Sequence, residues 1–409
     1  VCASGSSPMG TGLTYQLHLE KWGRVLVSIK KKRVLVLAAC VALCLGLFAH
    51  GSAAEKVVKL GWVGSLTGDQ AIWGQCELNT VKMLAEELNA AGGLLGAKIE
   101  VVGYDHRGDA MECVNAVRRL TSQDKVVCIL GPNASGHAIP IASVLEEMKV
   151  PDIATVATNP KVTVVDGKVK PFNFRVCFID PYQGAVAAGF AYDVLKFTKA
   201  AVLYDVADDY SQGLTEFFIK TFTEKGGKIV AKEAFKFGDT DFRPQLSKIK
   251  AANPEIIFMP YFFKEVALSA NQARELGIKA TLMGGDGWPS EVLIQMAKDA
   301  VHGSYVVNHL DYDDPDVQDF KTRYTAKYKR AVELNGYLVH DAFLMFVDAV
   351  KRANSFSPVA LRDALESTNI MGITGRIKIN PATHNPEGKE AAIIRIMDGN
   401  YVFQQKYAP

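Results

Sequence analysis

The chain has 409 residues, of which 48% are hydrophobic and 22% are charged, as is typical of soluble globular proteins. This composition excludes a disordered chain, a collagen and a polytopic membrane protein, and the length predicts two or three domains. Six basic residues and one acidic residue precede residue 55, which leaves 40 basic against 43 acidic residues and a net charge of about −3. This balance gives no support to nucleic-acid binding.

The N-terminal region has the pattern of an export signal. Lys30–Arg33 is a positive block, Val34–Phe48 carries no charge, and small residues precede Glu55. This order predicts a signal peptide at residues 30–54, with cleavage after Ala54, and therefore a periplasmic or otherwise extracytoplasmic protein.

Two other interpretations of this region are less favoured. The apolar run is shorter than the roughly 20 residues that a transmembrane anchor needs. A lipoprotein attached at Cys40 would leave the apolar residues Val41–Phe48 behind the lipid. Residues 1–29 are expected to come from an over-extended gene start and to have no structural role.

Four cysteines remain in the predicted exported part: Cys76, Cys113, Cys128 and Cys177. An oxidising compartment permits a disulfide, and Cys113 and Cys128 are the nearest pair in sequence. However, the predicted elements place these two at opposite ends of a sheet, beyond the roughly 7 Å that a disulfide spans. Buried unpaired thiols are therefore favoured. The sequence has no CxxC motif, so neither a zinc site nor a thioredoxin-like site is predicted.

From Lys56 onward, strand-like and helix-like patterns alternate, which predicts βαβ units and parallel sheets. The first group has predicted strands at Val57–Val63, Ile99–Tyr104, Val126–Leu130 and Ile153–Thr155, with helices around Leu78–Leu88, at Met111–Gln123 and at Ile139–Met148. The second has strands at Ala200–Asp205, Lys228–Ala234, Ile256–Pro260 and Thr281–Gly284, with helices at Gly213–Lys225, Phe242–Ala252, Lys264–Leu276 and Glu291–Ala297. Two sheets are expected, separated near residue 178.

The C-terminal quarter departs from this alternation. Three helices are predicted in succession, at Asp316–Lys329, Tyr337–Arg352 and Val359–Leu365. Strands follow at Ile377–Ile379, Ala391–Met397 and Tyr401–Gln405, with Asp398-Gly399-Asn400 as a turn.

Motifs for catalysis and for cofactor binding are missing from the sequence. The segment after the first strand does not fit G-x-G-x-x-G, and there is no phosphate-binding G-x-x-x-x-G-K-[ST] loop. The histidines after residue 55 show no metal-binding spacing and are expected to be solvated or packed. No Ser/His/Asp set stands out. The sequence therefore predicts no cofactor and no metal, and an exported α/β enzyme is the weaker alternative.

Polar and aromatic residues instead gather where the predicted strands end, the edge at which open α/β sheets bind ligands. In the first half these residues are Ser65, Thr67, Trp73, Asn133, Ala134, Ser135 and the segment Ala157–Pro160. In the second half they are Tyr210, Phe262 and the segment Gly284–Trp288. Their placement in two equivalent halves predicts a shared site for a small ligand, with the glycine-flanked Asp286 facing a cationic group.

The chain resembles the periplasmic solute-binding proteins of ABC transporters, in the leucine/isoleucine/valine-binding branch, over residues 57–407. The matching motifs, in chain order, are Gly64–Gly68, Trp73-Gly74, Asn89–Gly93, Tyr104-Asp105, Gly131–Ser135, Phe174-Arg175, Asp180–Gly184, Tyr210–Gly213, Gln272–Gly277 and Gly284–Gly287. The resemblance implies the two-lobed type I fold, with three crossings at the hinge and a ligand enclosed between the lobes. Lobe one would comprise 57–179 plus 310–382, and lobe two 180–309 plus 383–409.

The resemblance also implies a non-enzymatic carrier that delivers a small amino acid to the permease of an ABC transporter. The ligand carboxylate would bind Ser135 and Thr158, with Ala157 contributing backbone. The ammonium would meet Asp286, with the Ala157 carbonyl as a second partner. The side-chain pocket would be walled by Trp73, Tyr210, Phe262 and Trp288.

Two departures from the family pattern limit the choice of ligand. Asp286 stands where the branched-chain binder has a glutamate, one methylene longer, and Phe262 replaces a tyrosine. A small or medium apolar amino acid, branched-chain or similar, is expected, while an amide, an aromatic acid or another small solute stays open. A ligand-sensing receptor of the same fold is the alternative function. The carrier is expected to be monomeric.

Overall fold

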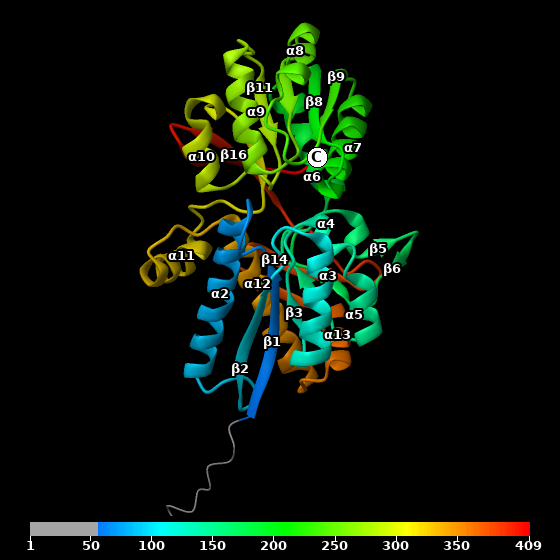
Figure 1. The fold of residues 1–409 in the computed structure, drawn as a ribbon, viewed down its shortest axis with the longest axis vertical. Helices are drawn as coiled ribbons and strands as arrows, with labels where there is room; N and C mark the ends of the chain where they lie inside the picture. The colour runs from blue at the N-terminus through cyan, green and yellow to red at the C-terminus, as the bar shows by residue number, and fades with distance from the viewer. Residues whose placement is uncertain (1–55) are drawn as a thin grey trace, which may run out of the picture. The chain divides into compact units, whose positions relative to one another are not determined.

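Two β-sheets organise residues 56–409, the part of the chain that the computed structural model describes (Figure 1). The predicted signal peptide and Cys40 lie outside the described residues. The first sheet is parallel throughout and has, in spatial order, the strands β2 (Ala97–Asp105), β1 (Lys56–Gly64), β3 (Ile129–Leu130), β4 (Asp152–Ala154) and β7 (Asn173–Arg175). We call this sheet and the elements packed on it lobe one.

The second sheet forms the centre of what we call lobe two. Its spatial order is β17 (Asn400–Tyr407), β16 (Ala391–Met397), β12 (Tyr305–Asn308), β11 (Thr281–Gly284), β10 (Ile256–Phe258), β8 (Lys199–Asp205) and β9 (Lys228–Phe235). The strands from β12 to β9 are parallel, whereas β16 and β17 are antiparallel to their neighbours. The predicted α/β class with parallel-dominated sheets is thus confirmed.

Helices cover both sheets. Lobe one has α2 (Ala71–Ala90), α3 (Ala110–Arg119), α4 (Ser135–Ala138), α5 (Ala142–Met148), α11 (Pro315–Tyr328), α12 (Leu334–Ala353) and α13 (Pro358–Glu366). Lobe two has α6 (Asp180–Gly189), α7 (Asp209–Glu224), α8 (Arg243–Ala252), α9 (Phe263–Glu275) and α10 (Glu291–Ala297). Short π- and 3₁₀-helical turns lie at Leu120–Asp124, Pro160–Val162, Phe190–Val194 and Lys298–Val301.

Two small sheets complete lobe one: β13 (Asn369–Gly372) with β14 (Gly375–Asn380) and β15 (Asn385–Glu387), and β5 (Val164–Val165) with β6 (Lys168–Val169). Segments far apart in sequence meet here. The helix α12 packs on α2, as the orange and blue ribbons of Figure 1 show. Central strands are buried on both faces, and β10 has no exposed residue, because helices cover the two sides of each sheet.

Local signals explain where several helices begin. Asp109 caps α3, its carboxylate accepting from Glu112 N at 2.9 Å. Asp208 caps α7 in the same way, accepting from Ser211 N at 2.9 Å. Such caps satisfy amides that have no partner inside the helix, and they set the orientation of the loops that face the other lobe.

The chain passes between the two sheets three times. The first crossing joins β7 to α6, the second joins β12 to α11, and the third joins β15 to β16. The third differs from the predicted boundary at 382/383, because β15 pairs with β14 through Lys378 and Glu387 and so stays with lobe one. The crossing therefore follows residue 387.

All four cysteines of the described chain are unpaired and buried, in agreement with the favoured interpretation. Cys113 packs in one cluster of lobe one and Cys128 in another. Burial raises the pKa of Cys76 and of Cys177 to about 12, so these side chains are thiols at neutral pH.

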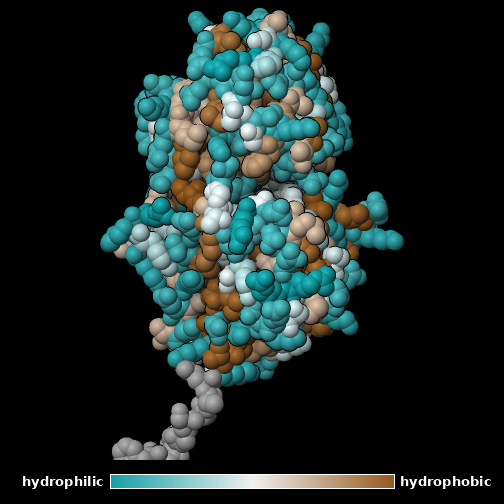
Figure 2. All heavy atoms as spheres, in the orientation of Figure 1, coloured by the Kyte–Doolittle hydropathy of each residue, from teal (hydrophilic) through white to brown (hydrophobic). Residues whose placement is uncertain are grey.

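Hydrophilic residues dominate the face of the molecule drawn in Figure 2, and hydrophobic residues lie between them in small groups. Among residues 56–409, every helix is too short or too polar to cross a bilayer.

Candidate functional site

A small cavity of about 20 Å³ lies between the two lobes. It is lined by Trp73, Asn133, Ala134, Ser135, Val156 and Asn335 of lobe one, and by Tyr210, Phe262, Asp286 and Gly287 of lobe two. Most of these residues follow the carboxyl ends of strands, where the sequence predicts a site. Five of the residues that the resemblance assigns to the ligand share this lining: Trp73, Ser135, Tyr210, Phe262 and Asp286. Asn133, Ala134 and Gly287, which were expected near the strand ends, line it with them.

An aromatic wall on this cavity is built from both lobes. The ring of Trp73 meets that of Phe262 edge-on, with centroids 5.7 Å apart, and Tyr210 stacks on Phe262 at 5.5 Å. Trp73 Nε1 also donates to the carbonyl of Pro289 at 3.3 Å. The start of α2 can approach the loop after β1 because Gly74 has no Cβ, which would lie 1.8 Å from a backbone oxygen. Residues of both lobes therefore contribute to this wall.

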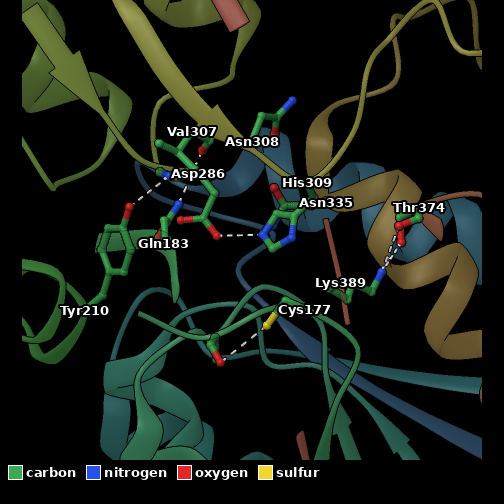
Figure 3. A network of polar contacts seen from close by, with 12 residues as sticks. Cys177, Gln183, Tyr210, Asp286, Val307, Asn308, His309, Asn335, Thr374 and Lys389 are labelled. Carbon is green, nitrogen blue, oxygen red and sulfur yellow. Dashed lines mark hydrogen bonds and ion pairs between the residues drawn. The ribbon is translucent and has the colours of Figure 1, made fainter. Parts of the chain in front are cut away.

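Asp286 is held by His309, and the loop that carries it is held by Tyr210 (Figure 3). Its side chain is 1% exposed, and its Oδ2 lies 2.9 Å from His309 Nε2. The loop after β11 is fastened by Tyr210, whose hydroxyl accepts from Gly287 N at 3.2 Å. Burial and the charge of Asp286 raise the pKa of Tyr210. A Cβ on Gly285 would lie 2.6 Å from the Tyr210 hydroxyl, so only glycine permits this approach.

His309 is a site residue that the sequence did not reveal. It follows β12, a strand that was not predicted, and its ring stacks on Phe178 with centroids 3.6 Å apart. Burial lowers the pKa of His309, so the imidazole is neutral at pH 7. A carboxylate oxygen can only accept, and Nε2–H is therefore the donor to Asp286. The short apolar run Tyr305–Val307 was the available signal for this strand.

Ser135 provides the opposite end of the cavity. It opens α4, where the first backbone amides have no partner inside the helix. Its Oγ accepts from Asn159 N at 3.1 Å, so the hydroxyl proton stays available to a ligand. The Asn159 side chain in turn donates across the lobes to the carbonyl of Asp209 at 2.7 Å. A donor on lobe one thus faces the acid on lobe two.

Two predicted residues, Ala157 and Thr158, are fully buried but do not line the cavity. The Ala157 carbonyl, expected to meet the ligand ammonium, accepts instead from the buried guanidinium of Arg175 at 2.7 Å. The Thr158 carbonyl accepts from Asp180 N at 2.9 Å, at the first crossing. Both residues therefore belong to the support of the site in this structure.

The position of Trp288 differs from the expectation that it walls the side-chain pocket. Its side chain is fully buried in the core of lobe two, and its Nε1 donates to the carbonyl of Met259 at 2.8 Å. The ring lies over Gly284, where a Cβ would be 2.0 Å from Nε1. Trp288 thus packs behind the loop of Asp286 and not on the cavity.

A buried carboxyl, Glu77, stands behind the lobe-one side of the cavity. It accepts from Trp62 Nε1 at 3.2 Å, from Thr155 Oγ1 at 2.7 Å and from Asn335 Nδ2 at 3.3 Å. Burial raises the pKa of Glu77 to about 7. Neither Glu77 nor Asn335 was predicted. They lie on α2 and α12, which begin earlier in the chain than the predicted helices around Leu78–Leu88 and at Tyr337–Arg352.

The arrangement suits binding of a small zwitterion. Asp286 is the one charged side chain of the lining, hydroxyl and amide donors stand on the other lobe, and aromatic surface lies between them. Within the described residues, the His, Cys, Asp and Glu side chains form no group suited to holding a metal ion.

Comparisons with known proteins agree with this architecture. A family model described as "Periplasmic binding protein" matches residues 57–400. An "Amino acid binding protein" of Pseudomonas aeruginosa is 29% identical over 354 residues, which cover 86% of this chain and 92% of that protein.

Solved structures are similar over the same part. A leucine-binding protein from Thermotoga maritima has 34% identity and a TM-score of 0.80, covering 86% of this chain and 99% of its own. A branched-chain amino acid transporter substrate-binding protein from Streptococcus pneumoniae, in complex with isoleucine, has 27% identity and a TM-score of 0.80, covering 87% and 100%. The chain therefore belongs to the periplasmic binding protein family, whose members bind solutes outside the cytoplasm and are not enzymes.

Proposed function

We propose that this protein is the extracytoplasmic solute-binding component of an ABC importer and that it captures a small amino acid between its lobes. The predicted signal peptide at residues 30–54 would export it, and it would deliver the ligand to a membrane permease as a monomer.

The observation that carries this proposal is that Asp286 of lobe two and Ser135 of lobe one line the same cavity. The Asp286 carboxylate would hold the ligand ammonium, while the Ser135 hydroxyl and the amides at the start of α4 would hold its carboxylate. Trp73, Tyr210 and Phe262 would cover the side chain. Relatives named for leucine and for branched-chain amino acids support the choice of an amino acid.

The proposal is tested by titration calorimetry of residues 55–409 against the twenty amino acids, after unfolding and refolding to remove any co-purified solute. In the Asp286→Ala variant, binding should weaken by about 2–5 kcal/mol, the range for removing one partner of a buried charge pair. Asp286→Asn keeps the size of the side chain and an acceptor for His309. If binding weakens by a similar amount in this variant, the loss is due to the missing negative charge.

The matched control is Asp241→Asn, at an exposed position that bonds only Arg243 among its charged neighbours. This control should leave the dissociation constant unchanged. Folded protein that binds no amino acid would overturn the proposal, and a panel of amides and aromatic acids would then identify the solute class.

A further inference from the structure

Asn133 is a buried amide on the cavity without a hydrogen-bond partner. The residue follows β3 and is 4% exposed, and it contributes to the lining between the lobes. Neither its Nδ2 nor its Oδ1 has a hydrogen-bond partner among the described residues. Buried amides are normally paired, because water can no longer satisfy them.

The other polar side chains of this lining are engaged. Asn335 donates to Glu77, and Asp286 accepts from His309. Ser135 and Tyr210 accept from backbone amides. Asn133 therefore stands apart as the lining residue whose donor and acceptor are both free to meet a ligand.

The unpaired carboxamide of Asn133 indicates which ligand side chain can pair with it. A carboxamide presents a donor and an acceptor side by side, and a carboxamide or hydroxyl on the ligand can pair with it. An aliphatic side chain would leave both atoms unsatisfied. A charged side chain would have no opposite charge here, since Asp286 is the one charged residue of the lining and is assigned to the ligand ammonium.

Resting on the proposed function, we propose that the ligand is a small amino acid with an uncharged hydrogen-bonding side chain, of the amide or hydroxyl class, and that Asn133 recognises that side chain. This inference departs from the apolar side chain expected from the sequence and keeps the small amino acid. A second amide, Asn335, lies in the same lining and adds to its polarity.

The test compares ligands that match in shape and differ in hydrogen bonding: threonine against valine, and asparagine against leucine. Calorimetry of the wild-type protein should show the polar member of at least one pair binding tenfold or more tightly, a difference of about 1.4 kcal/mol. In Asn133→Leu this preference should disappear or reverse. The control Asn115→Leu, at an exposed position on α3, should keep the wild-type preference.

Three results would overturn the inference. Valine and leucine binding at least as tightly as their polar partners would refute it from the wild-type protein alone, while leaving the amino-acid carrier intact. Equal weakening of both members of a pair in Asn133→Leu would assign Asn133 to the ligand backbone. Folded protein that binds none of the four amino acids nor any other would refute the proposed function together with it.

Discussion

Glu77 should make the stability of the protein fall as pH rises. The group has a folded pKa of about 7 against an ordinary value of 4.5, and it is fully buried. An acid whose pKa is raised by folding binds its proton more tightly in the folded state. Stability is therefore greatest below the unfolded value and is lost as pH rises towards 7.

The magnitude follows from the two pKa values. At 1.36 kcal/mol per pKa unit, the raised pKa of Glu77 corresponds to about 3 kcal/mol of stability, and most of this is lost between pH 5 and pH 8. Glu77→Gln removes the titration, and its amide can still pair with Thr155 and Trp62 in one orientation.

The assay is urea unfolding followed by circular dichroism at several pH values. Between pH 5 and pH 8, the free energy of unfolding should fall by about 2–3 kcal/mol more in the wild-type protein than in Glu77→Gln. The comparison uses the change in unfolding free energy with pH, so a loss of stability in Glu77→Gln that is the same at every pH does not affect it. Glu146→Gln, at an exposed position on α5, is the control and should follow the wild-type profile. Parallel profiles for wild type and Glu77→Gln would refute the reasoning.

Two further predictions concern the support of the site. Arg175→Ala removes two charged hydrogen bonds, at 2.7 and 2.8 Å, to the backbone carbonyls of Ala157 and Asn159. The free energy of unfolding should fall by about 3–6 kcal/mol. A loss below about 1 kcal/mol in urea titration would show that these two bonds are dispensable. The four cysteines within residues 56–409 are buried and unpaired. In a protein that starts at residue 55, dithiothreitol should therefore not change the melting temperature, and a maleimide should label the native protein far more slowly than the unfolded chain. A drop in melting temperature on reduction would contradict this.

Much of the fold could be predicted because apolar spacing is a local signal. The predicted bounds of α10 and β16 agree with the structure residue by residue, and those of β1 and β8 agree within one residue. β12 was missed because a four-residue strand between α10 and α11 carries little periodic pattern. Its omission also hid His309, whose role depends on where β12 ends.

The site could be predicted only in part. Residues after strands, such as Ser135 and Asp286, were expected at one edge because parallel strands bring their carboxyl ends together there, and both line the cavity. The environment of Trp288 was not predictable, because whether an aromatic ring after a glycine turn faces the cavity or the core depends on packing far away in sequence. Asn335 was missed for the same reason: it lies on α12, which packs on α2 and β3, elements far away in sequence.

The aromatic wall has a consequence for how a carrier of this design selects its cargo. Trp73 belongs to one lobe, and Phe262 and Tyr210 belong to the other. A protein with its lobes apart would therefore offer an arriving solute only part of the surface that encloses its side chain. Correct and incorrect solutes would then arrive at similar rates. Discrimination would come after binding, because the closed protein would release incorrect solutes faster than the correct one. The dissociation rates of the solutes would then differ more than their association rates.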